Sequence, residues 1–162
     1  MEILTFRPGI INKRSFSSLI KKSFKGSEDA HIENWFSYDE MLANIGTGRG
    51  VCLFASDNGV ICASVYAQTE SPINAREGTE KWIINLLAVL PEYEGRGVGT
   101  KLMEAIEEHA RNKGAIKIFV TTNEPERAVQ LFYVSRGYNF AGRVEDYQYG
   151  VGNTAMFFMK YL

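Results

Sequence analysis

The sequence predicts a mixed α/β fold in which one central sheet carries helices on both faces. Strand-like and helical segments follow one another in the order β-α-α-β-β-β-α-β-α-β-β. A nearly continuous apolar run at 82–90 is typical of a buried strand, and a glycine-rich loop joins this run to an amphipathic helix. No repeat, low-complexity tract or linker divides the chain, so residues 1–162 are expected to form a single domain.

The first half of the chain supplies two helices and three strands. Apolar residues alternate before Pro8, recur at helical spacing from Phe16 to Phe24, and flank an Asn58-Gly59 pair that favours a tight hairpin turn. Asp39 and Glu40 suit the first turn of a second helix, because carboxylates stabilise helix N-termini. The expected elements are a strand at 2–7, helices at 12–24 and 37–45, and strands at 51–55 and 60–68.

The second half also combines strands and helices, and it follows a polar loop at 71–79. The apolar run at 82–90 is expected to be buried on both faces. Pro125 suits the first turn of a helix, and Gly137 suits the end of one. The expected elements are a strand at 82–90, a helix from the glycine loop to Gly114, a strand at 116–121, a helix at 125–136, and strands at 138–145 and 154–161.

Composition excludes several functional classes. The net charge is −1 and Lys21-Lys22 is the longest basic run, so no nucleic-acid partner is expected. The longest apolar run has nine residues, too few to span a bilayer, and the N-terminus does not resemble a signal peptide, which favours a cytoplasmic protein. Cys52 and Cys62 are interpreted as buried thiols in adjacent strands, and no metal site is expected.

The loop at 95–99 carries glycine at every second position, directly before a helix. The unpaired amides and the dipole of a first helical turn attract phosphate, and the missing Cβ atoms permit close approach. The order Gly99-Thr100-Lys101 does not match a Walker A loop, and Thr100 replaces the third glycine of a dinucleotide fingerprint. The loop is therefore predicted to hold a pyrophosphate, and a nucleotide-binding protein of another class is a distant alternative.

Two stretches resemble the acetyl-CoA motifs of the GNAT acetyltransferase superfamily, and the resemblance covers about residues 50–145. The first motif is matched by Leu87, Val89, Pro91, Tyr93, Gly95, Gly97 and Gly99. The second motif is matched by Asn123, Ala128, Phe132, Tyr133, Gly137 and Tyr138. The resemblance implies a GNAT-like, mostly antiparallel sheet and acetyl-CoA as co-substrate.

The resemblance also assigns site residues. Backbone groups of Leu87 and Val89 would run beside the pantetheine arm, Asn123 would hydrogen-bond that arm, and Tyr133 would lie beside the thioester sulfur as general acid. Ala128 and Phe132 belong to the same cofactor motif. The amides expected to hold the pyrophosphate are those of Glu94, Gly95, Arg96, Gly97, Val98, Gly99 and Thr100.

Two positions depart from the family pattern. Glu94 stands where Gln or Arg is usual, and its carboxylate would weaken pyrophosphate binding if it faced the phosphates. Ile83 stands where some members carry a Glu that acts as general base. The candidates to replace that base are Glu80, Glu33, His31 and Asp146, whereas His109 is interpreted as structural.

The segments at 31–40 and 145–150 mix carboxylates with Trp or Tyr, which suits a cationic amine; Trp35, Phe36 and Tyr38 equally suit anchoring of a helix. The predicted function is an acetyl-CoA-dependent N-acetyltransferase that transfers an acetyl group directly to a primary amine of a small molecule, peptide or protein. A non-catalytic acyl-CoA-binding or sensor module is the alternative. No membrane partner is expected, and a homodimer remains possible.

Overall fold

The computed structural model describes residues 1–26, 35–69, 81–147 and 152–162. The described helices and strands follow the predicted order, with one added 3₁₀ turn. They are β1 (Glu2–Thr5), α1 (Lys13–Ser23), α2 (Tyr38–Gly46), β2 (Gly50–Asp57), β3 (Val60–Thr69), β4 (Lys81–Val89), the 3₁₀ turn (Pro91–Tyr93), α4 (Val98–Asn112), β5 (Lys117–Asn123), α5 (Arg127–Val134), β6 (Asn139–Val144) and β7 (Ala155–Tyr161).

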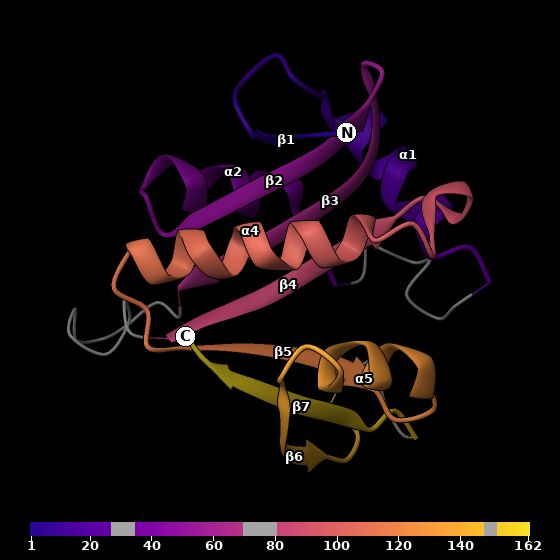
Figure 1. The fold of residues 1–162 in the computed structure, drawn as a ribbon, viewed down its shortest axis with the longest axis vertical. Helices are drawn as coiled ribbons and strands as arrows, with labels where there is room; N and C mark the ends of the chain where they lie inside the picture. Colours follow the sequence, from indigo (N-terminus) through magenta and orange to yellow (C-terminus); the bar gives the residue numbers. More distant parts are fainter. Residues whose placement is uncertain (27–34, 70–80, 148–151) are drawn as a thin grey trace.

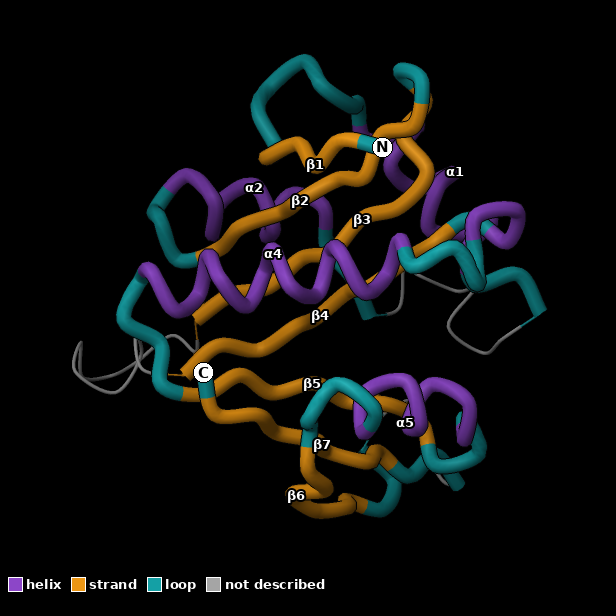
Figure 2. The backbone as a smooth tube through the Cα atoms, viewed as in Figure 1, coloured by secondary structure: helices purple, strands orange, loops and turns teal. Residues whose placement is uncertain are grey.

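One seven-stranded sheet runs through the molecule in the order β1-β2-β3-β4-β5-β7-β6 (Figures 1 and 2). Its pairs are antiparallel except for β4 and β5, which are parallel. A parallel pair requires a crossover, and α4 supplies it. The predicted mixed, mostly antiparallel fold is therefore confirmed.

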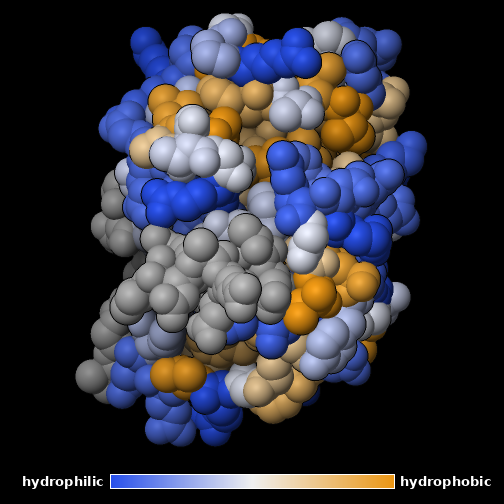
Figure 3. All heavy atoms as spheres, turned by 90° about the vertical axis from the view of Figure 1, so that its left-hand side faces the viewer, coloured by the Kyte–Doolittle hydropathy of each residue, from blue (hydrophilic) through white to orange (hydrophobic). Residues whose placement is uncertain are grey.

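The helices cover both faces of the sheet, as predicted. Phe16 and Ile20 of α1 and Met41 of α2 pack in one apolar cluster with Phe54. On the other face, α4 lies across β2, β3 and β4 (Figure 1). Its buried side chains pack with strand residues in the second apolar cluster; they are Val98, Leu102, Met103, Ile106 and Ala110. On the surface view of Figure 3, hydrophilic side chains are interspersed with smaller apolar areas.

Local signals in the sequence place several element ends correctly. Asn12 and Ser37 cap α1 and α2 by accepting the N–H groups of Ser15 (2.9 Å) and Glu40 (3.2 Å). Asn58 and Gly59 form the two-residue turn between β2 and β3 with φ values of 49° and 80°. Two successive positive φ values are the geometry that a right-twisted hairpin requires.

Two predictions about the second half are wrong in detail. The helix predicted from Pro125 begins at Arg127, because Pro125 lies before the N-cap residue Glu126 and its carbonyl accepts the Arg127 N–H at 2.9 Å. Strand β4 is not fully buried on both faces. Buried and half-buried residues alternate along it, and Leu87 and Val89 are half-buried because they line a cavity.

A buried carboxylate connects α4 to the C-terminal strands. Glu107 of α4 is 6% exposed and accepts hydrogen bonds from the Tyr138 hydroxyl (3.0 Å) and the Lys160 Nζ of β7 (2.6 Å). Both carboxylate oxygens are thereby satisfied, as burial of a charge requires. These two hydrogen bonds hold Tyr138 and β7 against α4.

Within the described residues, no helix has the length and apolarity needed to cross a bilayer.

Both cysteines are expected to be silent toward thiol reagents in the native protein. Cys52 and Cys62 lie in the adjacent strands β2 and β3, are at most 1% exposed, and are not disulfide-bonded. Burial raises the pKa of the Cys52 thiol to about 12, so the reactive thiolate is scarce at neutral pH. An aromatic disulfide reagent should release no chromophore until the protein is unfolded. Rapid release from the native protein would contradict this burial.

Candidate active site

Strands β4 and β5 separate halfway along their length. They pair only from Lys81 opposite Lys117 to Ile84 opposite Val120. Next to this point β4 carries a bulge, since Ile84 pairs with Ala67 and Leu86 pairs with Tyr66, which leaves Asn85 as the extra residue. Beyond it β4 continues along β3 and β5 along β7, so a gap opens between the two central strands (Figures 1 and 2).

Backbone groups of β4 face this gap. The Leu90 N–H donates to the Cys62 carbonyl of β3 at 2.9 Å. In an antiparallel ladder such pairs alternate with pairs whose N–H and C=O point outward. The N–H and C=O of Val89, opposite Ala63, therefore point away from β3, and the same alternation applies to Leu87. An extended ligand in the gap finds hydrogen-bond partners on the open edge of β4.

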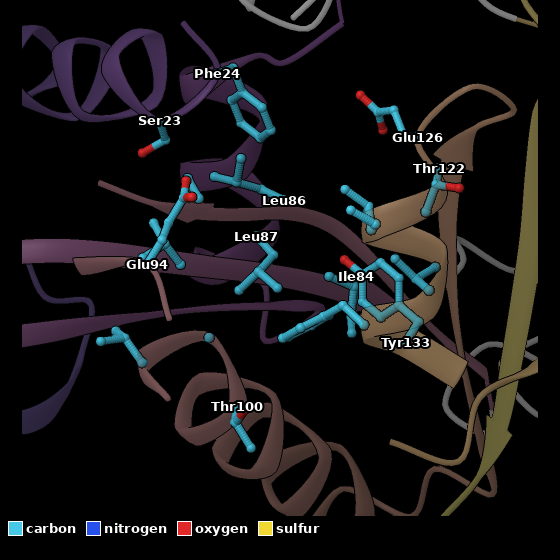
Figure 4. A pocket seen from close by; sticks show the side chains of 18 of the residues that line it. Ser23, Phe24, Ile84, Leu86, Leu87, Glu94, Thr100, Thr122, Glu126 and Tyr133 are labelled. Atoms are coloured by element: carbon cyan, nitrogen blue, oxygen red, sulfur yellow. The ribbon is translucent and has the colours of Figure 1, made fainter. Parts of the chain in front are cut away.

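A cavity of about 720 Å³ occupies the gap and continues to the start of α4 (Figure 4). It is lined by all the predicted site residues except Arg96, which is exposed and stacks its guanidinium over Tyr93 at 5.4 Å from the ring centroid. The predicted residues that line it are Leu87, Val89, Glu94, Gly95, Gly97, Val98, Gly99, Thr100, Asn123, Ala128, Phe132 and Tyr133.

The glycine loop leaves donors at the N-terminus of α4. Gly95 and Gly97 have φ values of 70° and 76°, a region that glycine enters without strain. The first helical hydrogen bond runs from the Lys101 N–H to the Gly97 carbonyl at 3.1 Å, so the amides of Val98, Gly99 and Thr100 precede it. The first turn of α4 contains no acidic residue, which keeps this end electropositive.

One predicted donor is already engaged inside the loop. The Glu94 N–H donates to the carbonyl of Pro91 at 3.2 Å, within the 3₁₀ turn. The helix-start amides are therefore better placed than the Glu94 amide to hold an anion.

Arg136 is a cavity residue that the sequence analysis missed. It lies just after α5, and its guanidinium stacks on Phe132 at 3.5 Å from the ring centroid. It donates to the Phe132 carbonyl at 2.6 Å and to the Thr100 hydroxyl. A fixed positive charge thus lies beside the N-terminus of α4, where an anion is favoured. The signal in the sequence was an arginine immediately before Gly137.

Tyr133 is a buried residue of α5 that lines the same cavity. Only 4% of the residue is exposed, and Figure 4 shows its ring reaching into the pocket from α5. Burial raises the pKa of the phenol above its ordinary value; the nearby carboxylate of Glu126 raises it further, and Arg136 opposes the shift. The phenol is therefore protonated and remains a hydrogen-bond donor throughout the neutral range.

The residues just after α1 and just before α2 also contribute to the cavity lining. Phe24 and Trp35 line it and meet edge to face with centroids 5.8 Å apart. By contrast, Phe36 and Tyr38 pack on the buried Phe16 at 5.7 and 5.4 Å. The aromatic segment near 35–38 therefore does both things considered from the sequence: Trp35 faces the cavity, and the next aromatics anchor the chain.

The candidate general bases are less well placed. His31, Glu33 and Glu80 lie outside the described residues. Asp146 accepts the Gly152 N–H at 2.6 Å, adopts a φ of 52°, and belongs to an exposed turn rather than to the cavity lining.

His109 and the possible metal ligands were also considered from the sequence. His109 packs edge to face on Trp82 at 5.7 Å, and burial lowers its pKa, in agreement with a structural role. In the described part of the chain, no group of three His, Cys, Asp or Glu side chains is arranged to hold a metal ion.

Replacing Glu94 with glutamine is expected to change the affinity for CoA, the ligand that the sequence resemblance implies, by less than about threefold. Figure 4 shows the Glu94 side chain directed away from Thr100, toward Ser23 at the end of α1. In water, a unit charge even at about 6 Å from a phosphate costs about 0.7 kcal/mol, and salt screens longer distances. Calorimetric titration at low and high salt measures this, with Glu92→Gln as an exposed control outside the cavity lining. A large tightening confined to low salt would show that the carboxylate faces the phosphates.

Comparison with protein families identifies one matching model. The model described as the acetyltransferase (GNAT) family matches residues 15–138. N-alpha-acetyltransferase 30 of Schizosaccharomyces pombe is 33% identical over 82 residues, which cover 51% of this chain and 53% of that protein. The match thus spans about half the length of this curated relative.

Solved structures share the fold over nearly the whole chain. A probable acetyltransferase from Staphylococcus epidermidis aligns with a TM-score of 0.82 at 13% identity, covering 99% of this chain and 98% of that one. Ribosomal-protein-alanine N-acetyltransferase from Brucella melitensis aligns with 0.80 at 14% identity, covering 98% and 99%. A GNAT family acetyltransferase from Elizabethkingia anophelis, solved with acetyl-CoA bound, aligns with 0.72 at 16% identity, covering 99% and 97%.

Proposed function

The chain belongs to the GNAT acetyltransferase family, and from this membership we propose that it is an enzyme that transfers the acetyl group of acetyl-CoA to a primary amine. Transfer is direct, within a complex that holds both substrates. The observation that carries the proposal is the single cavity that joins the glycine loop, the open edge of β4 and the Tyr133 phenol. These are the parts needed to hold a pyrophosphate, an extended arm and a thioester in line.

In this proposal, acetyl-CoA extends through the cavity from the glycine loop to Tyr133. Its pyrophosphate takes the amides at the start of α4, with Arg136 as a nearby positive charge. Its pantetheine arm lies along β4 and uses the outward backbone groups of Leu87 and Val89, while Asn123 bounds the arm from β5. The acetyl-CoA carried by the related Elizabethkingia anophelis protein supports this choice of co-substrate.

The chemistry requires a polarised carbonyl and a stabilised leaving group. The Val89 N–H, which points into the gap, is a donor for the thioester oxygen as negative charge develops on it. The Tyr133 phenol is a donor for the sulfur as the C–S bond breaks. The remaining free space, next to Phe24 and Trp35, receives the amine.

A peptide α-amine is the first acceptor class that we propose. The named curated relative is an N-alpha-acetyltransferase, and its match covers 51% of this chain. The rings of Phe24 and Trp35 suit an amine by apolar and cation–π contact. Amines of small molecules are the second class within the same proposal.

The test is a turnover screen with acetyl-CoA against N-terminal peptides and small primary amines. Release of the CoA thiol should depend on the amine, and mass spectrometry should find the acetylated amine. The protein's own thiols are expected not to contribute. Acetyl-CoA binding without turnover on any amine would contradict the enzyme and favour the sensor module, for which Ile83 in place of a Glu is the supporting observation.

A further inference from the structure

The cavity contains a carboxylate with no assigned role. Glu126 is half-buried, lines the cavity, and occupies the N-cap position of α5. Its side chain makes no capping hydrogen bond to the helix, so helix capping does not account for it. Among the described residues that line the cavity, Glu94 is the other carboxylate, and that residue is exposed.

Glu126 is the N-cap residue of α5, and Tyr133 lies near the end of the same helix. Both residues line the cavity. Figure 4 shows both side chains at the pocket. The carboxylate is close enough to the phenol to raise its pKa, which places the two groups in one electrostatic environment.

This pair has the composition that acyl transfer to an amine requires. The phenol donates toward sulfur, and a carboxylate accepts a proton from nitrogen. The resemblance drawn from the sequence places the general base of some family members at position 83, which is isoleucine here and does not line the cavity. Glu126 lines the cavity from the connection between β5 and α5, across the gap from β4.

We propose that Glu126 is the general base that removes the proton from the acceptor amine, an inference that rests on the proposed acetyl transfer. The neutral amine attacks the thioester carbon, a C–N bond forms, and the carbonyl electron pair moves to oxygen. Glu126 takes one N–H proton from the resulting ammonium centre. The carbonyl re-forms, the C–S bond breaks, and the thiolate leaves with a hydrogen bond from Tyr133. Glu126 then returns its proton to the thiolate or to solvent.

Glu126→Gln is expected to lower kcat by about 10²-fold at neutral pH while leaving acetyl-CoA binding unchanged, because the amide cannot accept the proton. Glu126→Asp keeps a carboxylate and should recover part of the rate. The matched control is Glu124→Gln, two residues away, whose exposed carboxylate pairs with Arg143 at 3.3 Å and does not line the cavity. This control should retain parental activity.

The pH profile separates a base from a structural group. The other charged or titratable residues of the described cavity lining are Lys25 just after α1, Tyr93 of the 3₁₀ turn, Glu94 of the glycine loop, Tyr133 of α5 and Arg136 just after α5. With Glu126 present the rate should level off once the amine is neutral. In Glu126→Gln it should keep rising with pH, since hydroxide or buffer must replace the base.

Two results would overturn the proposal. One is a Glu126→Gln variant as active as Glu124→Gln, and the other is a higher KM for the amine with unchanged kcat, which would make Glu126 an anchor only. Turnover by the parent protein tests the proposed function, whereas the comparison of the variants tests the role of Glu126 as general base. Thermal stabilisation by CoA in every variant shows that the fold and the cofactor site are intact.

Discussion

Gly99→Val is expected to abolish acetyl-CoA binding while the protein remains folded. Gly99 lies in the first turn of α4, where a Cβ atom would come within 3.4 Å of the Phe132 ring and 3.7 Å of Val89. Its φ is not positive, so valine adds no left-handed strain, unlike at Gly97, where φ is 76°. The added methyl groups fill the passage between the helix-start amides and β4, which the pyrophosphate and the arm must share.

Thermal unfolding measures this effect. Acetyl-CoA at about 100 times its Kd should stabilise the parent by about 2.7 kcal/mol, a rise in Tm of about 5–10 °C for a chain of this size. Gly99→Val should show no rise, and Gly99→Ala an intermediate one. Gly46→Val is the control, since its Cβ enters open space at the end of α2. A normal rise in Gly99→Val would show that CoA does not use this passage.

Tyr133→Phe should lower turnover by about 10²-fold and leave acetyl-CoA affinity nearly unchanged. The substitution removes only the hydroxyl from a residue that is 4% exposed. A free thiol has a pKa of about 8.5, whereas burial keeps the pKa of the Tyr133 phenol above its ordinary value of 10.0. Complete proton transfer to the thiolate is therefore uphill, and the phenol acts mainly as a hydrogen-bond donor. This places the loss at the low end of the range for a missing general acid.

The direction of the pKa shift also sets the pH dependence. A phenol whose pKa is raised stays protonated as the pH increases, so Tyr133 should not cause an alkaline loss of activity below pH 10 in the parent. Steady-state rates with a working amine acceptor, with and without the hydroxyl, measure its contribution. Equal rates in the two proteins across the pH range would reduce Tyr133 to a packing residue, and a parallel loss of CoA affinity would assign it to binding.

Much of the fold was predictable because its signals are local. The side chains of Asn12 and Ser37 accept backbone N–H groups three residues further on. The turn at Asn58-Gly59 depends only on the φ values of two adjacent residues. The sequence alone therefore locates all three features. The start of α5 was misplaced because Pro125 fits a first helical turn by its own geometry. Here the chain instead enters the helix at Arg127, after the N-cap residue Glu126.

The site was predictable only where a motif marks it. The glycine loop and the segment from Asn123 to Tyr133 line one cavity, but the opening between β4 and β5 depends on the bulge at Asn85. That bulge exists only relative to the partner strand and leaves no local pattern. Arg136 was missed because its position before Gly137 does not reveal its contact with Thr100, which spans 36 positions of the chain.

A crystal structure of the protein with acetyl-CoA tests the account most directly. We expect the pyrophosphate at the amides of Val98, Gly99 and Thr100, and the pantetheine arm in the gap beside Leu87 and Val89. The thioester sulfur should lie within hydrogen-bonding distance of the Tyr133 hydroxyl. Acetyl-CoA bound outside this gap, or with its sulfur far from Tyr133, would contradict the account.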